Sequence, residues 1–468
     1  MTAACRGLAT VGRVARADDH RDVVPFRSAV RAWFGISLQT FGGPAGQIAV
    51  MQRAMVDERR WISQRRFLHA LNFCMLLPGP EAHQLAIYVG WLLNGRRGGM
   101  VAGVLFVLPG MVALLVLSAL YVGLGDTAVV SALFTGLGAA VVAIVVQALV
   151  RVAGRALTHP LLVGVAVAAF VALTVFGVPF PIVIAGAAGL GWLAARRIPS
   201  LAGAGGHGAQ RSGEAPALVA DDALHAESAS TARAVRTLGL GIVVWIVPIA
   251  AAAVLTGPGS VYTSQGLFFA GTALVTFGGA YAVLAFVAQQ AVQTYGWVTA
   301  GDMVRGLALA ETTPGPLIMV VQFVAFLGAY ADPAPLSPWT AGVVASLLVT
   351  WVTFVPSFVF VFVGAPFIER LRHNRALAGA LTGVTAAVVG VIAALAVYFA
   401  VATLFAQTRR VDLGPLAITL PDLASIRPAS VAIALVAAVL LFAARWSVLR
   451  VLGVCAVLGL AAGLVVGV

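Results

Sequence analysis

The side chains best suited to chemistry in this sequence stand beside two Pro-Gly-Pro tripeptides, each within a long apolar segment. Glu81 and His83 follow Pro78-Gly79-Pro80, and Glu311 shortly precedes Pro314-Gly315-Pro316. A charged side chain at the centre of a membrane helix costs about 2.5–3.5 kcal/mol on insertion scales, so such residues are candidates for function. We expect Glu81, His83 and Glu311 to exchange protons and so couple ion movement to a gradient. The alternative for Glu81 is that it only caps the helix that begins there.

Both tripeptides are expected to end one helix and begin another. Proline removes a backbone donor and clashes with the preceding turn, whereas the second proline suits the first position of a new helix. The new helix would present free N–H groups and a partial positive charge, which favour anions. The alternative is that these residues merely kink packed helices. The candidate anion-binding residues include the glycines of two Phe-Gly-Gly sequences. They are Gly42, Gly43, Pro44, Gln47, Asn72, Pro78, Gly79, Pro80, Gln84, Gly278, Gly279, Thr312, Thr313, Pro314, Gly315 and Pro316.

The stretch between the first Phe-Gly-Gly and the first Pro-Gly-Pro is strongly basic. Its arginines are Arg53, Arg59, Arg60, Arg65 and Arg66. One arginine about 4 Å from a unit negative charge is worth on the order of 4 kcal/mol at an effective dielectric constant of 20. The cluster is therefore a candidate electrostatic funnel for an anion. The alternative is an ordinary cytoplasmic loop, because such loops of membrane proteins are rich in arginine.

These landmarks occur twice in one register, which indicates an internal duplication. The sequence from Phe41-Gly42-Gly43 through Trp61 to the first Pro-Gly-Pro recurs with identical spacing in the second half, as Phe277-Gly278-Gly279, Trp297 and the second Pro-Gly-Pro. Further on the copies still correspond but at a larger offset, as for Pro109 and Pro356. The second copy therefore contains an insertion of about 11 residues, which we place around 330–340 because that stretch is rich in proline.

The composition excludes a water-soluble globule. Of 468 residues 61% are hydrophobic and only 10% are charged, with a mean hydropathy of +1.00. Ordinary soluble domains carry roughly a quarter charged residues. The net charge of +12 comes from 29 basic residues that are all arginine, and it fits the loops of a membrane protein better than nucleic-acid binding. Without lysine there is no Walker-type ATP site, and the three scattered cysteines predict no metal site.

The sequence predicts an all-α polytopic membrane protein with about 13 hydrophobic segments, six before a linker and seven after it. The expected parts are a cytoplasmic arm (1–27), a first repeat (28–197), a flexible cytoplasmic linker (198–236), an extra membrane helix (237–257), a second repeat (258–410) and C-terminal membrane helices (411–468). The extra helix makes the number of crossings between equivalent points odd, so the second repeat is expected to be inverted in the membrane. Whether segments 28–50 and 67–95 cross the membrane or re-enter on the same side stays open, with re-entry favoured because it keeps the arginine cluster inside.

The motifs also resemble those of a known family. The runs from Phe41 to Gln47, from Arg59 to Trp61, from Leu77 to Ala82, from Thr276 to Ala280 and from Thr312 to Pro316 resemble the chromate ion transporter family in its long two-domain form, over roughly residues 28–405. The resemblance implies export of chromate across the bacterial inner membrane, chromate resistance, and a relation to the similarly tetrahedral sulfate. A dianion matches helix N-termini and arginine better than it matches a carboxylate-lined cation path.

Alternative functions remain to be separated. The same architecture could import or exchange sulfate or another oxyanion. A membrane enzyme is disfavoured because no nucleophile–base motif or two-histidine metal spacing is present. The expected partners are a small inorganic oxyanion and the lipid bilayer, with no nucleic acid, ATP or cofactor; the sequence leaves open whether the chain forms a homodimer.

Overall fold

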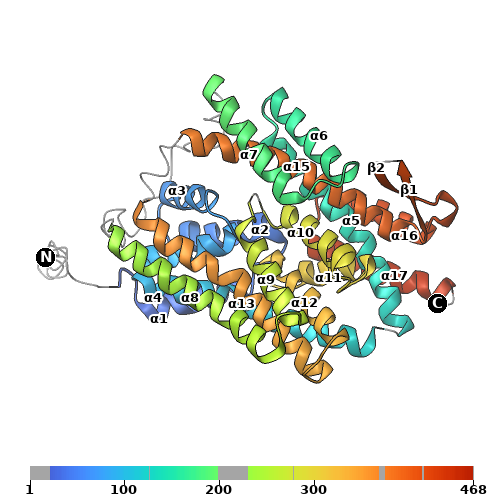
Figure 1. Cartoon of the computed structure of the whole chain (residues 1–468), viewed down its shortest axis with the longest axis horizontal. Coiled ribbons are helices and arrows are strands. Elements are labelled where there is room, and N and C mark those ends of the chain that lie inside the picture. Colours follow the sequence, from blue (N-terminus) through green and yellow to red (C-terminus); the bar gives the residue numbers. More distant parts are fainter. Residues whose placement is uncertain are drawn as a thin grey trace, which may run out of the picture.

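The computed structural model describes residues 22–125, 127–198, 230–277, 279–367, 375–413 and 416–466, most of which are helical (Figure 1). Gly278, most of the N-terminal arm and linker residues 199–229 lie outside the described residues. The predictions made for them are therefore not addressed by the structure.

The first repeat contains seven α-helices and a short π-helix. They are α1 (Phe26–Ser37), α2 (Gly43–Gln52), η1 (Arg53–Glu58), α3 (Gln64–Cys74), α4 (Glu81–Leu124), α5 (Ala128–Ala156), α6 (Pro160–Thr174) and α7 (Phe180–Arg197). After the linker comes α8 (Thr231–Thr256), which includes the predicted extra helix.

The second repeat and the C-terminal helices that follow it have a similar order of elements. They are α9 (Val261–Leu274), α10 (Ala280–Gln289), the π-helix η3 (Gln290–Thr294), α11 (Ala300–Thr312), η4 (Leu317–Met319), α12 (Val320–Ala331), α13 (Pro338–Gly364), η5 (Ala365–Phe367), α15 (Arg375–Leu404), α16 (Pro428–Phe442) and α17 (Val448–Val466). Helices α3 and α11 begin at equivalent positions of the Phe-Gly-Gly register, and α5 and α15 begin at equivalent positions of the Pro109–Pro356 register. Helices α6 and α16 follow in the same order, although the connection before α16 is longer. The duplication read from short motifs therefore extends to the helices themselves, including both π-helices.

Five helices of the described chain are long and apolar enough to cross a membrane: α4, α5, α8, α13 with η5, and most of α15. This agrees with an all-α polytopic membrane protein, while the count of 13 crossings stays a prediction. One segment differs from expectation. Residues 411–421, predicted as part of a membrane-helix region, instead belong to an antiparallel hairpin of β1 (Thr408–Leu413) and β2 (Leu416–Pro421). Polar and apolar residues alternate only from Arg410 to Leu413, a short stretch with the period of a strand.

Helix α4 is two helices joined by a sharp turn. Asn94 and Gly95 have non-helical backbone angles, and Gly95 has a φ of 59°. A methyl group on Gly90 would lie 2.5 Å from the Gly98 carbonyl oxygen, so the two arms touch at glycines. The turn coincides with the predicted end of segment 67–95. In the second repeat α12 and α13 form the equivalent hairpin, and their loop at 332–337 lies in the predicted insertion.

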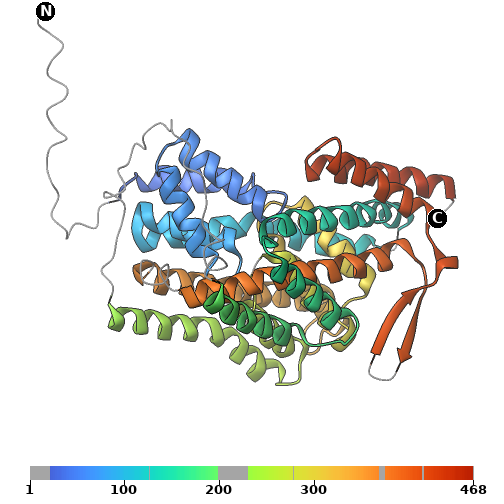
Figure 2. The same cartoon turned by 90° about the horizontal axis from the view of Figure 1, so that it is seen from above.

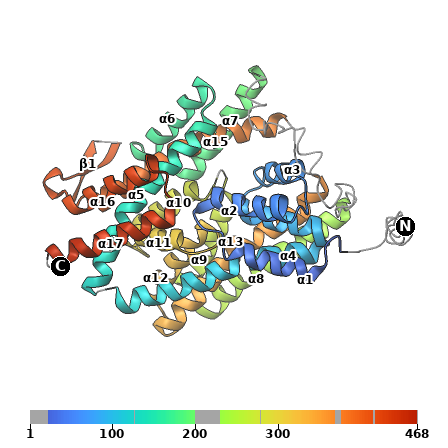
Figure 3. The same cartoon turned by 180° about the vertical axis from the view of Figure 1, so that it is seen from behind.

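The last two helices of each repeat pack against the other repeat. Helices α6 and α7 lie on α15, whereas α16 and α17 lie on α5 (Figures 1 and 3). Close approach depends on glycine in both places: Gly383 meets Gly191, and Gly136 meets Gly459. Small residues permit this kind of close helix crossing in membranes. The last helices of each half therefore pack against a long helix of the other half, α15 or α5.

The apolar interior is divided in two. One core consists of residues from Val24 to Phe106 with Val361 and Ala365, and a larger core holds the second repeat and the long helices. Figure 2 shows α1–α3 and the start of α4 in blue gathered at one end of the molecule and the C-terminal helices in red at the other. The broken helices of the first repeat thus form a layer of their own.

Candidate functional site

The two Pro-Gly-Pro tripeptides, here called the first break (Pro78–Pro80) and the second break (Pro314–Pro316), are joined to the opposite repeat by backbone hydrogen bonds. The Gly79 N–H donates to the Thr276 carbonyl at 2.8 Å, and the Gly315 N–H donates to the Thr40 carbonyl at 2.9 Å. Both glycines have positive φ, 123° and 110°, a conformation that strongly favours glycine. Thr40 and Thr276 are equivalent, so the contact is reciprocal, as in a two-fold interface.

The Phe-Gly-Gly turns place two further helix N-termini beside the breaks. Gly42 is the N-cap of α2 and Gly279 the N-cap of α10, with φ of 78° and 103° and no side-chain cap on either helix. Pro44 occupies the first turn of α2. Uncapped first-turn N–H groups are available to a negative charge. The predicted arrangement of glycines at helix starts is therefore present, except at Gly278, which the structure does not describe.

Two buried glutamines hold the breaks. Gln47 on α2 donates from Nε2 to the Gly315 carbonyl at 2.6 Å, across the two repeats. Gln84 on α4 donates from Nε2 to the Pro78 carbonyl at 2.6 Å, within the first break. Both residues were predicted to contact an anion, and the structure shows each Nε2 engaged with backbone.

The two intramembrane carboxyls meet around the start of α10. A methyl group on Gly279 would lie 3.4 Å from Glu81 Oε1, so Glu81 faces the second Phe-Gly-Gly turn. Glu311 is 1% exposed, and its Oε1 accepts a hydrogen bond from the Tyr281 hydroxyl at 2.5 Å. Its Oε2 has no partner among the described residues. The Tyr281 hydroxyl in turn lies beside Gly43 of the first repeat, so carboxyls far apart in sequence border one region.

His83 is fully buried among aromatic rings. Its ring lies 5.1 Å from that of Phe354, 5.2 Å from that of Phe358 and 6.3 Å from that of Phe106. Within the described chain neither ring nitrogen makes a hydrogen bond of acceptable geometry, although the Gly103 backbone lies near the ring. A buried imidazole of this kind is an uncommon feature, because buried polar groups are generally hydrogen-bonded.

The arginine cluster lies apart from the breaks. It occupies η1, the loop after η1 and the start of α3, and the rest of α3 (67–74) lies between Arg66 and the loop that leads to the first break. Arg53 and Arg65 are exposed, Arg59 approaches Glu58 at 3.6 Å, and the Arg59 guanidinium lies 5.7 Å from the Trp61 ring centre. Arg60 and Arg66 are partly buried. This position suits a role in attracting an anion but not direct coordination at the breaks.

The remaining candidates separate into two groups. The Thr312 and Thr313 hydroxyls donate to the Leu309 and Ala310 carbonyls, at 2.7 and 3.1 Å, and so satisfy the end of α11. Asn72 is exposed on α3. Its part in anion binding stays a prediction without support from its position.

Sequence reasoning missed several residues that the fold brings to this region. They are Tyr281, Thr353 and Ser357, together with Arg151 and Arg155, which end α5 and attract Glu311 and Glu81 electrostatically. Tyr281 stands two residues after Gly279 and could have been noticed there. No local pattern singles out the α13 hydroxyls, because only the folded chain brings them next to residue 79.

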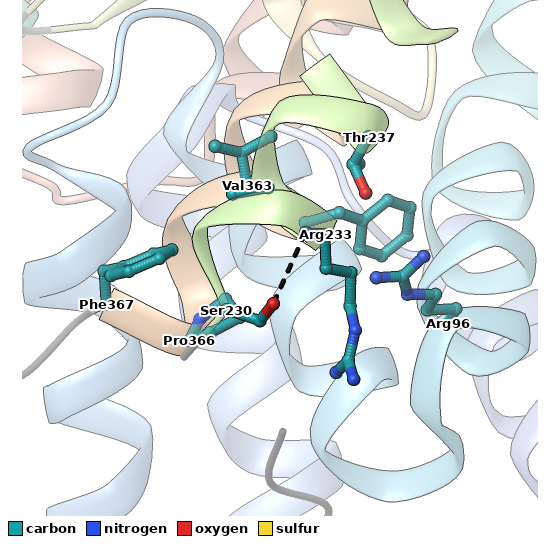
Figure 4. A pocket seen from close by; sticks show the side chains of 9 residues that line it. Arg96, Ser230, Arg233, Thr237, Val363, Pro366 and Phe367 are labelled. Atoms are coloured by element: carbon teal, nitrogen blue, oxygen red, sulfur yellow. Dashed lines mark hydrogen bonds between the residues drawn. The ribbon is translucent and has the colours of Figure 1, made fainter. Parts of the chain in front are cut away.

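A surface hollow lies elsewhere, where the start of α8 meets α4 and α13 (Figure 4). It is lined by Arg96, Ser230, Arg233 and Thr237 among others, and the Ser230 hydroxyl caps α8 by accepting from the Arg233 N–H. None of the predicted site residues lines it. The residues that line this hollow show that the start of α8 lies beside the Asn94–Gly95 turn.

Comparison with known proteins agrees with the motifs. Residues 28–192 and 263–460 match the family model described as chromate transporter. A chromate transport protein of Pseudomonas aeruginosa is 32% identical over 373 residues, covering 78% of this chain and 79% of its own length. Chromate transport proteins of Cupriavidus metallidurans (24%, covering 78% and 80%) and, as a probable one, of Synechococcus elongatus (25%, covering 75% and 79%) are also similar. No solved structure matches.

Proposed function

Since the chain belongs to the chromate transporter family, in its long two-domain form, we propose that it exports chromate from the bacterial cytoplasm across the inner membrane and so confers resistance to chromate. The observation that carries the mechanism is the reciprocal joining of the breaks, in which Gly79 bonds to Thr276 and Gly315 to Thr40. Broken helices that meet at a repeat interface are the arrangement in which many secondary transporters bind substrate. Rocking of one repeat against the other would expose the breaks to each side in turn.

An inverted arrangement of the repeats is part of this proposal. The start of α1 is tied to the Asn94 turn, because Asn94 donates to the Val24 carbonyl at 2.6 Å, and α8 begins beside the same turn. Helix α8 has 26 residues and therefore spans about 39 Å, enough to cross a membrane. Helix α9 begins at Val261, shortly after α8 ends, at the far side. The two repeats thus begin at opposite ends of α8.

The same geometry supports re-entrant helices and a cytoplasmic N-terminus. Helix α1 has 12 residues, α2 has 10, α3 has 11 and the first arm of α4 has about 13, all too short to cross about 30 Å of hydrocarbon. They lie together at one end of the molecule (Figure 2). Re-entry keeps the arginine cluster on the side of Arg96 and Arg233, where basic loops are expected in the cytoplasm.

The direction of transport has a physical basis. Moving one charge across 100 mV is worth about 2.3 kcal/mol, so a dianion leaving a negative interior gains about 4.6 kcal/mol. The membrane potential alone therefore favours export of chromate. Proton exchange at Glu81 or Glu311 would add coupling to the pH gradient, with Arg151 and Arg155 attracting the anion from the cytoplasmic side.

Uptake of labelled chromate into inverted membrane vesicles tests the proposal. Energised vesicles that contain the protein should accumulate chromate, and dissipating both the membrane potential and the pH gradient should abolish the accumulation. Sulfate is added as a competitor and, separately, as the labelled substrate. Inhibition by sulfate without its transport supports chromate export, whereas transport of sulfate in preference to chromate would replace this proposal by sulfate exchange.

A further inference from the structure

The two breaks share a backbone but differ in their surroundings. At the first break, His83 and Gln84 follow in the same repeat, Ser357 approaches from α13 of the other repeat, and Thr353 lies one helical turn before Ser357. The equivalent residues at the second break are apolar or glycine: Met319, Val320, Phe106 and Gly110. At these four positions the duplicated scaffold therefore carries polar side chains at the first break only. The polar side chains of the second break, Gln47, Thr312 and Thr313, already donate to backbone carbonyls.

The atoms next to Gly79 and Gly315 show this difference in side chains between the two breaks. A methyl group on Gly79 would lie 3.0 Å from Ser357 Oγ and 2.7 Å from Gln84 Nε2. A methyl group on Gly315 would instead meet the Cα of Gly110 at 3.3 Å. Two polar groups thus border the first break, where bare helix backbone borders the second.

Polar atoms around the first break lack partners. Ser357 and Thr353 are 1% and 3% exposed and lie one turn apart on α13, and His83 is 0% exposed. Within the described residues, Ser357 Oγ, Thr353 Oγ1 and both ring nitrogens of His83 make no hydrogen bond of acceptable geometry. Burying such groups unpaired is costly. The Ser357 hydroxyl beside Gly79 is therefore a buried donor without an acceptor, and His83 and Thr353, close to it in α4 and α13, are further potential donors.

The surroundings would strengthen a bond to an anion. Phe106, Phe354 and Phe358 enclose the His83 ring and exclude water on that side, and hydrogen bonds are stronger in such a low-dielectric environment. Pro80 provides no side-chain cap for α4, so the first-turn N–H groups of α4 point toward the break.

We propose that the first break alone forms the oxyanion subsite, in which the Ser357 and Thr353 hydroxyls and His83 donate to the anion together with the start of α4. The inference rests on the proposed function and adds to it which break binds and which α13 residues take part. The oxygens of a tetrahedral dianion only accept hydrogen bonds, and they match this set of donors. The second break acts as the structural counterpart that holds Thr40 and Gln47.

Equilibrium binding to the purified full-length protein tests the subsite, with chromate, sulfate and phosphate as separate probes. Ser357→Ala and Thr353→Val should each raise the Kd for chromate about tenfold, because a hydrogen bond to a charged group is lost. Ser346→Ala is the matched control. Its hydroxyl is buried on the same helix but already donates to the Gln322 carbonyl at 3.2 Å, so its Kd should be unchanged. Thermal unfolding of each variant verifies folding.

The outcomes separate the two proposals. If the wild type binds none of the three anions, the proposed function fails. If the wild type binds chromate and all three variants bind it equally well, the subsite is wrong while the function stands. Equal losses in all three variants would reflect disturbed packing of α13 and would also overturn the subsite. In proteoliposomes Ser357→Ala should raise KM with a maximal rate within about twofold of the wild type.

Discussion

The first and second breaks have nearly the same backbone but differ in their side chains at four equivalent positions. Gly79 and Gly315 have similar φ angles, 123° and 110°, and make equivalent hydrogen bonds. Yet His83 and Ser357 border one break, and Met319 and Gly110 the equivalent positions of the other. The comparison indicates that both breaks are needed for the backbone geometry between the repeats, whereas the proposed recognition of the anion uses the first break only. Polar groups that lost their role in the second copy could be replaced by better-packed apolar ones, since unpaired buried polar atoms destabilise the fold.

The carboxyls follow the same rule, because neither has an acidic counterpart. Residues equivalent to Glu81 and Glu311 are Leu317 and Met75. We expect Glu81→Gln and Glu311→Gln each to reduce the chromate uptake that a pH gradient drives at zero membrane potential by at least about 100-fold, because glutamine cannot exchange a proton. Vesicle uptake with an imposed pH gradient measures this. Glu58→Gln, at an exposed ion pair with Arg59, should transport normally. Wild-type uptake by either variant would remove that carboxyl from the mechanism.

Tyr281 provides a sharper test of the asymmetry, because its counterpart is Ala45. Tyr281→Phe removes the donor to Glu311 and should lower the transport rate about tenfold, the value of one hydrogen bond to a charged group. Initial rates in proteoliposomes report the loss. Tyr295→Phe, in which the ring can still stack on Trp297, is the control. A normal rate in Tyr281→Phe would mean that Glu311 works without its partner.

Gln47 tests whether the second break is mainly structural. Gln47→Val introduces the residue found at the equivalent position 283 and leaves the buried Gly315 carbonyl without its donor. The free energy of unfolding should fall by about 1–3 kcal/mol, measured by thermal or denaturant unfolding in detergent. Gln39→Leu, whose exposed amide donates only locally, to the Gly35 carbonyl near the end of α1, should change stability little. An unchanged stability in Gln47→Val would show that the cross-repeat bond is unimportant.

The smallest expected effect concerns a backbone position that the repeats share. Arg60 has a φ of 54° and its counterpart Gly296 a φ of 65°. Left-handed backbone costs an L-residue about 1–2 kcal/mol relative to glycine. Arg60→Gly should therefore raise the free energy of unfolding by about 1 kcal/mol, and Gly296→Ala should lower it by a similar amount. Denaturant unfolding in detergent measures both changes. Losing stability in Arg60→Gly would show that the side chain contributes more than the strain costs.

Much of the fold could be predicted because it has local causes. Proline and glycine at 78–80 and 314–316 break a helix wherever they occur, and the shared spacing revealed the duplication. The exchange of the α6–α7 and α16–α17 helices could not be predicted, since their apolar faces fit any membrane neighbour. The β-hairpin at 408–421 was missed because a short polar interruption among apolar segments resembles any loop.

The site was predicted where it lies next to the breaks and missed where it is completed from a distance. Glu81, His83 and Gln84 follow the first break directly. Ser357 and Tyr281 reach the first repeat from the other half of the chain, and a single sequence contains no sign of that proximity. Asn72 was proposed for its polarity alone, and the structure places it at the surface.

The exchange of terminal helices has a consequence for the chain as a whole. Because the last two helices of each half pack against a long helix of the other half, neither half is complete without the other. A covalent connection between residues 198 and 230 is then not required for the two halves to assemble. Two halves expressed as separate chains in one membrane should therefore associate through these helix contacts.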